Sequence, residues 1–172
     1  FAPEASQVAL MVNMMSGLSA AFAVLFMFWS VVLLFRKIYP DLENGSVNRQ
    51  IMVLCAAFIG ALSLTFSDSF WFNAVEAEVY AMASCIMAIL FYVGLLWERD
   101  MHKPRGNRWL ILISFIVGLS FGVHFMGLLT IPAIGYLYYF KNTKTITVKN
   151  FVVSSLIIVG SLMFIFKFSG MP

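Results

Sequence analysis

Charge is scarce in this sequence: Asp, Glu, Lys and Arg make up 11% of its 172 residues, against about 25% in an ordinary soluble domain. Hydrophobic residues make up 62%, and Phe alone occurs 18 times. So few polar side chains cannot cover a globule in water, which excludes a soluble enzyme and a disordered chain. The net charge of +3 is too small for a nucleic-acid-binding surface. The composition therefore predicts an integral membrane protein in contact with a lipid bilayer.

Cysteine is scarce as well. Cys55 and Cys85 both lie inside apolar stretches, where cysteine usually acts as a small hydrophobic residue. There is no C-x-x-C motif and no His/Cys cluster, so nothing indicates a zinc or redox centre; a divalent cation stays open as a cofactor. We recognise no cleavable signal peptide. We expect residues 1–172 to be a single transmembrane helical domain, and an internal part of a longer membrane protein.

Stretches without charge give the candidate membrane spans. They cover residues 13–35, 50–67, 79–97 and 150–166, each near the roughly 17–25 residues that cross a bilayer as a helix. A further stretch, residues 109–140, is too long for one span and short for two full ones. Because it contains Pro132 and several glycines, we predict a hairpin of two short helices that turns near residues 122–127. The predicted fold is all-α, a polytopic bundle of about six membrane helices.

The positions of Lys and Arg predict the orientation of these helices. Loops at residues 36–49, 98–108 and 141–149 contain 10 of the 11 Lys and Arg residues, and the exception is Lys167. The positive-inside rule places such loops in the cytoplasm. Both chain ends then lie outside, which means the periplasm for a protein of a bacterial inner membrane. The sequon at Asn44 would face the cytoplasm, so we interpret it as a turn.

Carboxylates gather in one predicted outer segment, residues 67–80, which contains no cation. Ionisable groups at a membrane edge are costly and usually functional, although a solvated loop explains Asp68 equally well. If residues 73–80 begin the third span as one helix, Asn73, Glu76 and Tyr80 share a face. Glu78 then points roughly 160° away from Glu76. We therefore predict that Glu76 and Tyr80 face a central cavity, and that Glu78 caps a helix or meets lipid headgroups.

His124 is the second candidate, because it lies at the predicted outer turn of the hairpin. A lone His is more often a packed, hydrogen-bonded residue than a catalyst. This one is on the same predicted side of the membrane as Glu76, where an imidazole could contact a phosphate.

Two segments resemble a known family. Residues 61–82, ALSLTFSDSFWFNAVEAEVYAM, resemble the second outer loop of GT-C-type membrane glycosyltransferases, in which a Glu and then a Tyr begin the next span. The form of this segment is most similar to the bacterial protein O-mannosyltransferase-like family. Residues 117–133, VGLSFGVHFMGLLTIPA, resemble the short helix hairpin of that superfamily. His124 is near the position of a Lys that many members carry at the outer turn.

The resemblance implies a membrane glycosyltransferase that moves a sugar from a polyprenyl-phosphate donor to a protein acceptor at the outer face. Glu76 and Tyr80 would shape the donor–acceptor cavity, and His124 would lie near the donor phosphate. The same resemblance makes three more residues of this segment candidates for substrate binding: Asp68, Asn73 and Glu78. Family members carry a catalytic Asp in an acidic motif of the first outer loop, and no such motif occurs here. We expect the catalytic base to lie upstream of Phe1, and we expect this fragment to be inactive alone.

The alternative is a transporter or channel-like helix bundle without covalent chemistry, in which Glu76 or Glu78 binds a cation or proton. Transporters usually bury their ionisable groups near mid-membrane and often contain inverted repeats. Here the acids lie at one predicted edge, and no repeat is evident. A structural assembly subunit has only the Gly118-x-x-x-Gly122 spacing in its favour.

Overall fold

The computed structural model describes residues 4–42, 45–76 and 78–168, and these residues form helices and no strand. Within them, the α-helices are α1 (Ala5–Ile38), α2 (Val47–Thr65), α3 (Asp68–Val75), α4 (Val79–Asp100), α5 (Arg108–Ser120), α6 (Thr130–Asn142) and α7 (Val148–Phe168). Two short 3-10 helices are η1 (Pro40–Leu42) and η2 (Phe125–Leu129). The predicted all-α fold is confirmed.

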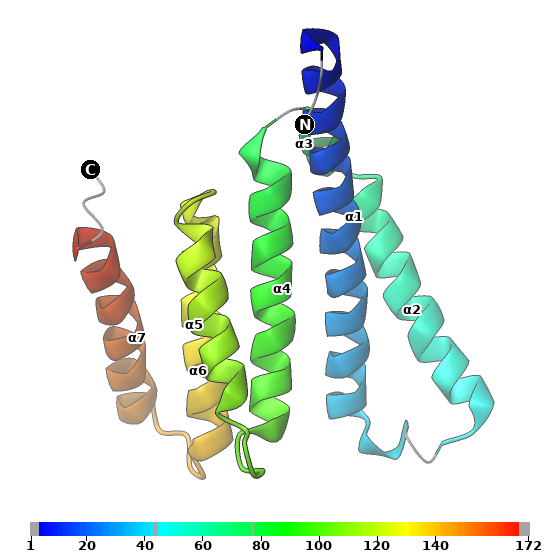
Figure 1. Cartoon of the computed structure of the whole chain (residues 1–172). Helices are drawn as coiled ribbons and strands as arrows, with labels where there is room; N and C mark the ends of the chain where they lie inside the picture. Colours follow the sequence, from blue (N-terminus) through cyan, green and yellow to red (C-terminus); the bar gives the residue numbers. More distant parts are fainter. Residues whose placement is uncertain (1–3, 43–44, 77, 169–172) are drawn as a thin grey trace.

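In the described part of the chain, four helices are long and apolar enough to cross a membrane: α1, α2, α4 and α7. They coincide with the four predicted charge-free spans. Helix α1 begins earlier than predicted, at Ala5, because residues 5–12 contain no Gly or Pro to end a helix. Its 34 residues extend for about 51 Å, so one end projects beyond the neighbouring helices (Figure 1).

Helices α5 and α6 form the predicted hairpin. Each contains 13 residues, or about 20 Å of helix, which is short of a hydrocarbon core about 30 Å thick. The chain turns at residues 121–124 and passes through η2 into α6. Pro132 lies in the first turn of α6, where its missing N–H interrupts no helical hydrogen bond. The predicted turn and the place of His124 within it are confirmed.

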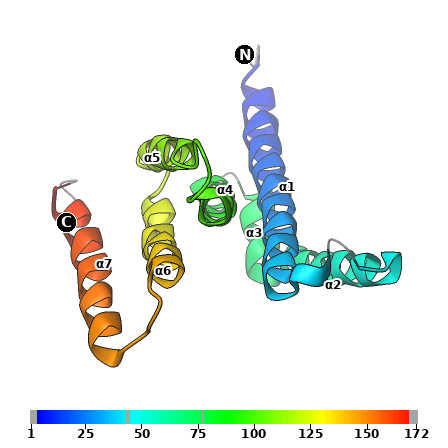
Figure 2. The same ribbon diagram turned by 90° about the horizontal axis from the view of Figure 1, so that it is seen from below.

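The helices stand in an open row with α4 near its middle. Helix α2 packs on α1, α1 packs on α4, and α4 packs on the α5–α6 hairpin. Helix α7 packs on α6 at the far end of the row, and α3 lies against α1 (Figures 1 and 2). Because the outer helices have a neighbour on one side only, many large apolar side chains remain exposed, as lipid contact requires.

Small side chains bring α1 and α4 together. Ser16, Ala20 and Ala23 are buried on α1, and Ala81 is buried on α4. Ala81 lies on the same helix face as Tyr92, whose ring contacts Phe26 and Trp29 of α1. Small residues at such spacings allow two membrane helices to approach closely. On the other side of α4, a core of larger residues joins it to the hairpin: Leu90, Val93, Trp97, Ile113 and Ile134.

The three loops rich in Lys and Arg lie at one end of the bundle, and the α3–α4 connection and the hairpin turn lie at the other (Figure 1). We call the first the basic end, which contains Lys37, Glu98 and Lys141, and the second the acidic end, which contains Glu76, Glu78 and His124. The cytoplasmic location of the basic end stays a prediction. Asn44, interpreted above as part of a turn, lies outside the described residues.

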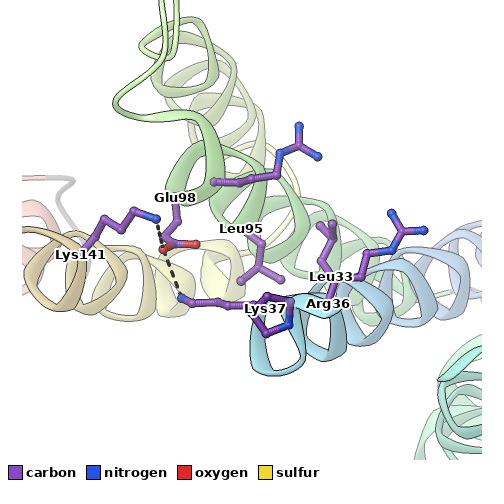
Figure 3. A pocket seen from close by; sticks show the side chains of 8 residues that line it. Leu33, Arg36, Lys37, Leu95, Glu98 and Lys141 are labelled. Carbon is purple, nitrogen blue, oxygen red and sulfur yellow. Dashed lines mark ion pairs between the residues drawn. The ribbon is translucent and has the colours of Figure 1, made fainter. Parts of the chain in front are cut away.

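Buried Glu98 joins three helices at the basic end. Its Oε1 forms ion pairs with Lys37 Nζ of α1 at 3.2 Å and with Lys141 Nζ of α6 at 3.0 Å. Figure 3 shows both lysines pointing toward this carboxylate. Only 5% of Glu98 is exposed, whereas both lysines reach solvent. One carboxylate therefore ties α1 and α6 to α4.

Asp100 anchors the connection from α4 to α5. Its carboxylate accepts two hydrogen bonds from Arg99, at 3.0 and 2.9 Å, and one from Lys103 at 2.9 Å. The indole N–H of Trp109 donates to it at 3.1 Å, from the beginning of α5. Gly106 passes so close to the Asp100 carbonyl oxygen that a Cβ would collide with it.

Gly127→Ala should destabilise the protein by about 1–3 kcal/mol, because the added methyl would lie 2.7 Å from Ser120 Cβ in packed surroundings. The matched control is Gly118→Ala in the same hairpin, where a Cβ meets nothing within 4 Å. The measurement is thermal unfolding in detergent micelles. Equal melting temperatures for the two variants would contradict the close packing at Gly127.

Glu98→Gln should cost about 1–2 kcal/mol of stability, because two ion pairs to a buried carboxylate are lost while the partly exposed lysines can be rehydrated. Asp41→Asn is the control, since Asp41 is an exposed acid at the same end, and it should change stability by less than about 0.5 kcal/mol. Both are measured by denaturant unfolding in the same detergent. If Asp41→Asn lowered the free energy of unfolding as much as Glu98→Gln does, the buried carboxylate would have no special role in stability.

Candidate functional site at the acidic end

The acidic segment does not form one helix, and this corrects the prediction for residues 73–80. Helix α3 ends at Val75, Glu76 has extended backbone angles, and α4 starts at Val79. The break arises where Glu78 takes the N-cap position of α4, with φ −117° and ψ 163°. Helical periodicity cannot be counted across it, so Glu76 and Tyr80 share no helix face. The prediction that Glu76 lies beside Tyr80 on one face is therefore wrong.

The two glutamates lie on the short joint between α3 and α4. The Glu78 backbone N–H donates to the Glu76 carbonyl oxygen at 2.8 Å, which draws the joint into a tight bend. Both side chains are exposed. The Glu78 carboxylate makes no capping hydrogen bond to α4, yet its negative charge lies at the positive end of that helix dipole. The joint thus presents two solvated carboxylates at the acidic end.

Helix α3 carries the remaining two polar candidates. Asp68 lies in its first turn and is exposed, a position where a carboxylate stabilises the helix dipole. Asn73 is half-buried. Helix α3 is held against α1 where the Ala74 carbonyl oxygen lies close to Gly17, 3.9 Å from the position of a Cβ there. The packing of α3 on α1 therefore sets where Asp68 and Asn73 lie.

Tyr80 and His124 are brought together by the fold. Their ring centroids lie 5.3 Å apart at an interplanar angle of 53°. Tyr80 comes from the first turn of α4, and His124 comes from the hairpin turn before η2. This contact joins two of the six predicted site residues. Within the described residues, neither ring forms a hydrogen bond or a ring contact with Asp68, Asn73, Glu76 or Glu78.

His124 has a defined orientation. Its Nδ1 accepts a hydrogen bond from the backbone N–H of Met126 at 3.2 Å, which caps η2. In the neutral ring the proton is then on Nε2, because Nδ1 acts as the acceptor. The side chain is half-buried beside Tyr80 and Phe125. His124 can therefore offer an N–H from Nε2 to an anion while Nδ1 holds the turn.

An apolar groove of about 490 Å³ runs along α4 between α1 and α6. One stripe of α4 forms its floor: Ser84, Met87, Ala88 and Phe91. Helix α1 supplies one wall, from Ala23 to Leu34, and the other wall is Leu129, Thr130 and Ala133. Leu64 of α2 and Phe70 of α3 also line the groove. Its few hydroxyl groups include Ser30 and Thr130, which both bond to carbonyl oxygens of their own helices or turns. The groove therefore offers a hydrocarbon surface.

Tyr80 lies near one end of this groove. It precedes Ser84 by four residues on α4, so the two side chains lie on the same helix face. His124 immediately precedes η2, which carries the groove residue Leu129. Tyr80 and His124 do not line the groove themselves; Tyr80 lies one helical turn beyond Ser84, toward the acidic end.

Sequence reasoning missed both the groove and the Glu98 ion pairs. A signal for Glu98 existed, since it is one of few acids in an otherwise basic loop and follows directly after a membrane span. No comparable signal marks the groove, because its residues have the same composition as the lipid-facing ones. As for a metal, the described residues contain no group of three or more His, Cys, Asp and Glu side chains that could hold an ion.

Comparison with known proteins places the chain in a family. The family model described as "Protein O-mannosyl-transferase TMEM260 N-terminal domain" matches residues 1–147. No curated protein gives a significant match, and no solved structure does. The match covers most of the chain, including α1 to α6, the Tyr80–His124 pair and the groove. The chain therefore belongs to the family of the protein O-mannosyl-transferase TMEM260 N-terminal domain.

Proposed function

We propose that this chain forms the donor-binding part of a membrane protein O-mannosyltransferase of the GT-C type. The donor would be a polyprenyl-phosphate sugar, and the acceptor a protein at the outer face of the membrane. The observation that carries the proposal is an apolar groove along α4 together with the Tyr80–His124 ring contact, which lies one helical turn beyond the groove residue Ser84. The family match supports an O-mannosyltransferase-like role.

The groove suits the lipid portion of such a donor. Its volume of about 490 Å³ falls within the roughly 300–1,000 Å³ of typical ligand sites. A prenyl chain is branched hydrocarbon, and the groove wall has the same character. A donor with its chain in the groove would place its phosphate near the acidic end, beside Tyr80 and His124.

Tyr80 and His124 can then act on the phosphate. The Nε2–H of His124 and the hydroxyl of Tyr80 are hydrogen-bond donors. When the bond between the sugar and the phosphate breaks, negative charge grows on the leaving phosphate. Donors fixed before the reaction stabilise that charge without the cost of reorganisation. His124 is fixed by its bond to Met126 and by its contact with Tyr80.

The polar residues of α3 and the joint would contact the sugar and the acceptor. Glu76 and Glu78 expose carboxylates that can accept hydrogen bonds from sugar hydroxyls or from the acceptor side chain. Asp68 and Asn73 border the same segment on α3.

The orientation belongs to the same proposal. If the basic end is cytoplasmic, the acidic end faces the periplasm in a bacterial inner membrane, or the lumen in a eukaryotic secretory membrane. A lipid-linked donor is met at the membrane surface, where both its chain and its phosphate can be accommodated.

Two substitutions in the full-length protein test the roles of the two His124 nitrogens separately. His124→Asn keeps an acceptor near Nδ1 for the Met126 N–H but has no group at Nε2, so transfer should fall about 10²-fold with little change in melting temperature. His124→Gln keeps a donor near Nε2 but loses the cap, so it should retain more transfer and lose about 1 kcal/mol of stability. Transfer is measured from a polyprenyl-phosphate sugar to an acceptor protein. Full transfer by His124→Asn would refute the phosphate contact.

Ala88→Phe should fill the groove and raise the KM for the lipid-linked donor at least about tenfold, equivalent to about 1.4 kcal/mol of lost binding. Ala21→Phe is the control, since Ala21 lies exposed on α1 and does not line the groove. Thermal unfolding shows whether both variants are folded. Equal KM values for the two folded variants would exclude the groove as the donor site.

A further inference from the structure

The basic end contains a pocket that the proposed transfer reaction does not use. Its volume is about 310 Å³. Residues from α1, η1, α4 and α6 line it: Leu33, Arg36, Lys37, Pro40, Leu95, Glu98, Arg99 and Lys141 (Figure 3). Four of these side chains are cations and one is a carboxylate. They come from segments far apart in the sequence, so the fold itself concentrates the positive charge.

The carboxylates near the pocket do not balance these cations. Glu98 is shared between Lys37 and Lys141, so its single charge meets two positive ones. Arg99 is paired with Asp100, which also holds Lys103. Arg36 makes no ion pair with any of the described residues. In Figure 3 its guanidinium group lies apart from the Lys37–Glu98–Lys141 ion pairs. Positive charge in excess therefore remains at the pocket.

The shape of the pocket indicates an anion that carries a hydrocarbon chain. Leu33 and Leu95 form its apolar side, and the groove begins on the same helices at Leu34 and Phe91. Positive side chains thus lie at the end of a hydrocarbon surface. Basic pockets between membrane helices bind the headgroups of anionic lipids, and a guanidinium pairs well with a phosphate because it offers two parallel N–H donors.

We propose that this pocket binds the phosphate of an anionic membrane phospholipid, with Arg36 as the principal contact and with Lys37 and Lys141 as further cations of the same pocket. The lipid would belong to the leaflet at the basic end, opposite the leaflet in which the sugar donor presents its phosphate. Glu98 holds the two lysines in place and so positions the site without touching the lipid. The proposal does not depend on sugar transfer, because lipid occupancy can be measured without it.

Native mass spectrometry of the purified full-length protein can test this site, with phosphatidylglycerol as the probe and zwitterionic phosphatidylcholine as the comparison lipid. Phosphatidylglycerol should bind more tightly than phosphatidylcholine. Arg36→Gln should weaken phosphatidylglycerol binding about fivefold. The matched control is Lys144→Gln, an exposed cation in the α6–α7 loop that does not line the pocket, and it should leave binding unchanged. Arg36→Lys should restore most of the affinity, because it keeps the charge.

Three outcomes would overturn the proposal. Equal losses at Arg36 and Lys144 would mean that the lipid responds only to the general charge of this face. Equal binding of the two lipids would mean that no anion is recognised. Displacement of phosphatidylglycerol by inorganic phosphate at matched concentration would make the pocket a site for a free anion instead of a lipid. Arg36 is exposed and outside the buried core, and thermal unfolding of each variant checks that it is folded.

Discussion

The close packing of α1 against α4 determines where the other features of the molecule lie. Small side chains such as Ser16, Ala20 and Ala81 are buried along the two helices, which lets their backbones approach in a medium where apolar burial alone does not favour contact. The remaining faces of α4 then hold α3, η2, α5 and α6. Tyr80, the floor of the groove and Glu98 are all carried by this one helix, so their relative positions depend on its packing.

The two ends of α4 use charge in opposite ways. At the basic end, buried Glu98 is compensated twice, by lysines from two other helices, because an unpaired charge there would be costly. At the acidic end, Glu76 and Glu78 remain exposed and so can be solvated without a partner. A carboxylate that is already paired holds helices together, whereas carboxylates in water are available to a ligand. The groove between α1 and α6 connects these two environments along a hydrocarbon surface.

Several elements could be predicted because their signals are local. The charge-free stretches fixed the four long helices, and Pro132 with the neighbouring glycines indicated the hairpin that α5 and α6 form. The break at Glu76–Glu78 could not be predicted in the same way, since the segment contains no Gly or Pro. It exists because α3 lies against α1 near Gly17 while α4 takes its own direction. Glu76 and Tyr80 would share a face only if residues 73–80 formed one continuous helix, and tertiary packing divides this segment between two helices.

The sequence by itself determined the membrane character, the approximate spans, the clustering of Lys and Arg in three loops and the place of His124 in a turn, because hydropathy and charge along the chain encode each of these. Only the tertiary structure decided which side chains meet. Tyr80 reaches His124, and Glu98 reaches Lys37 and Lys141, across long separations in the sequence. Charge counts predict which loops lie on the same side of a membrane, but the particular cation that meets a given carboxylate depends on how helices pack against α4.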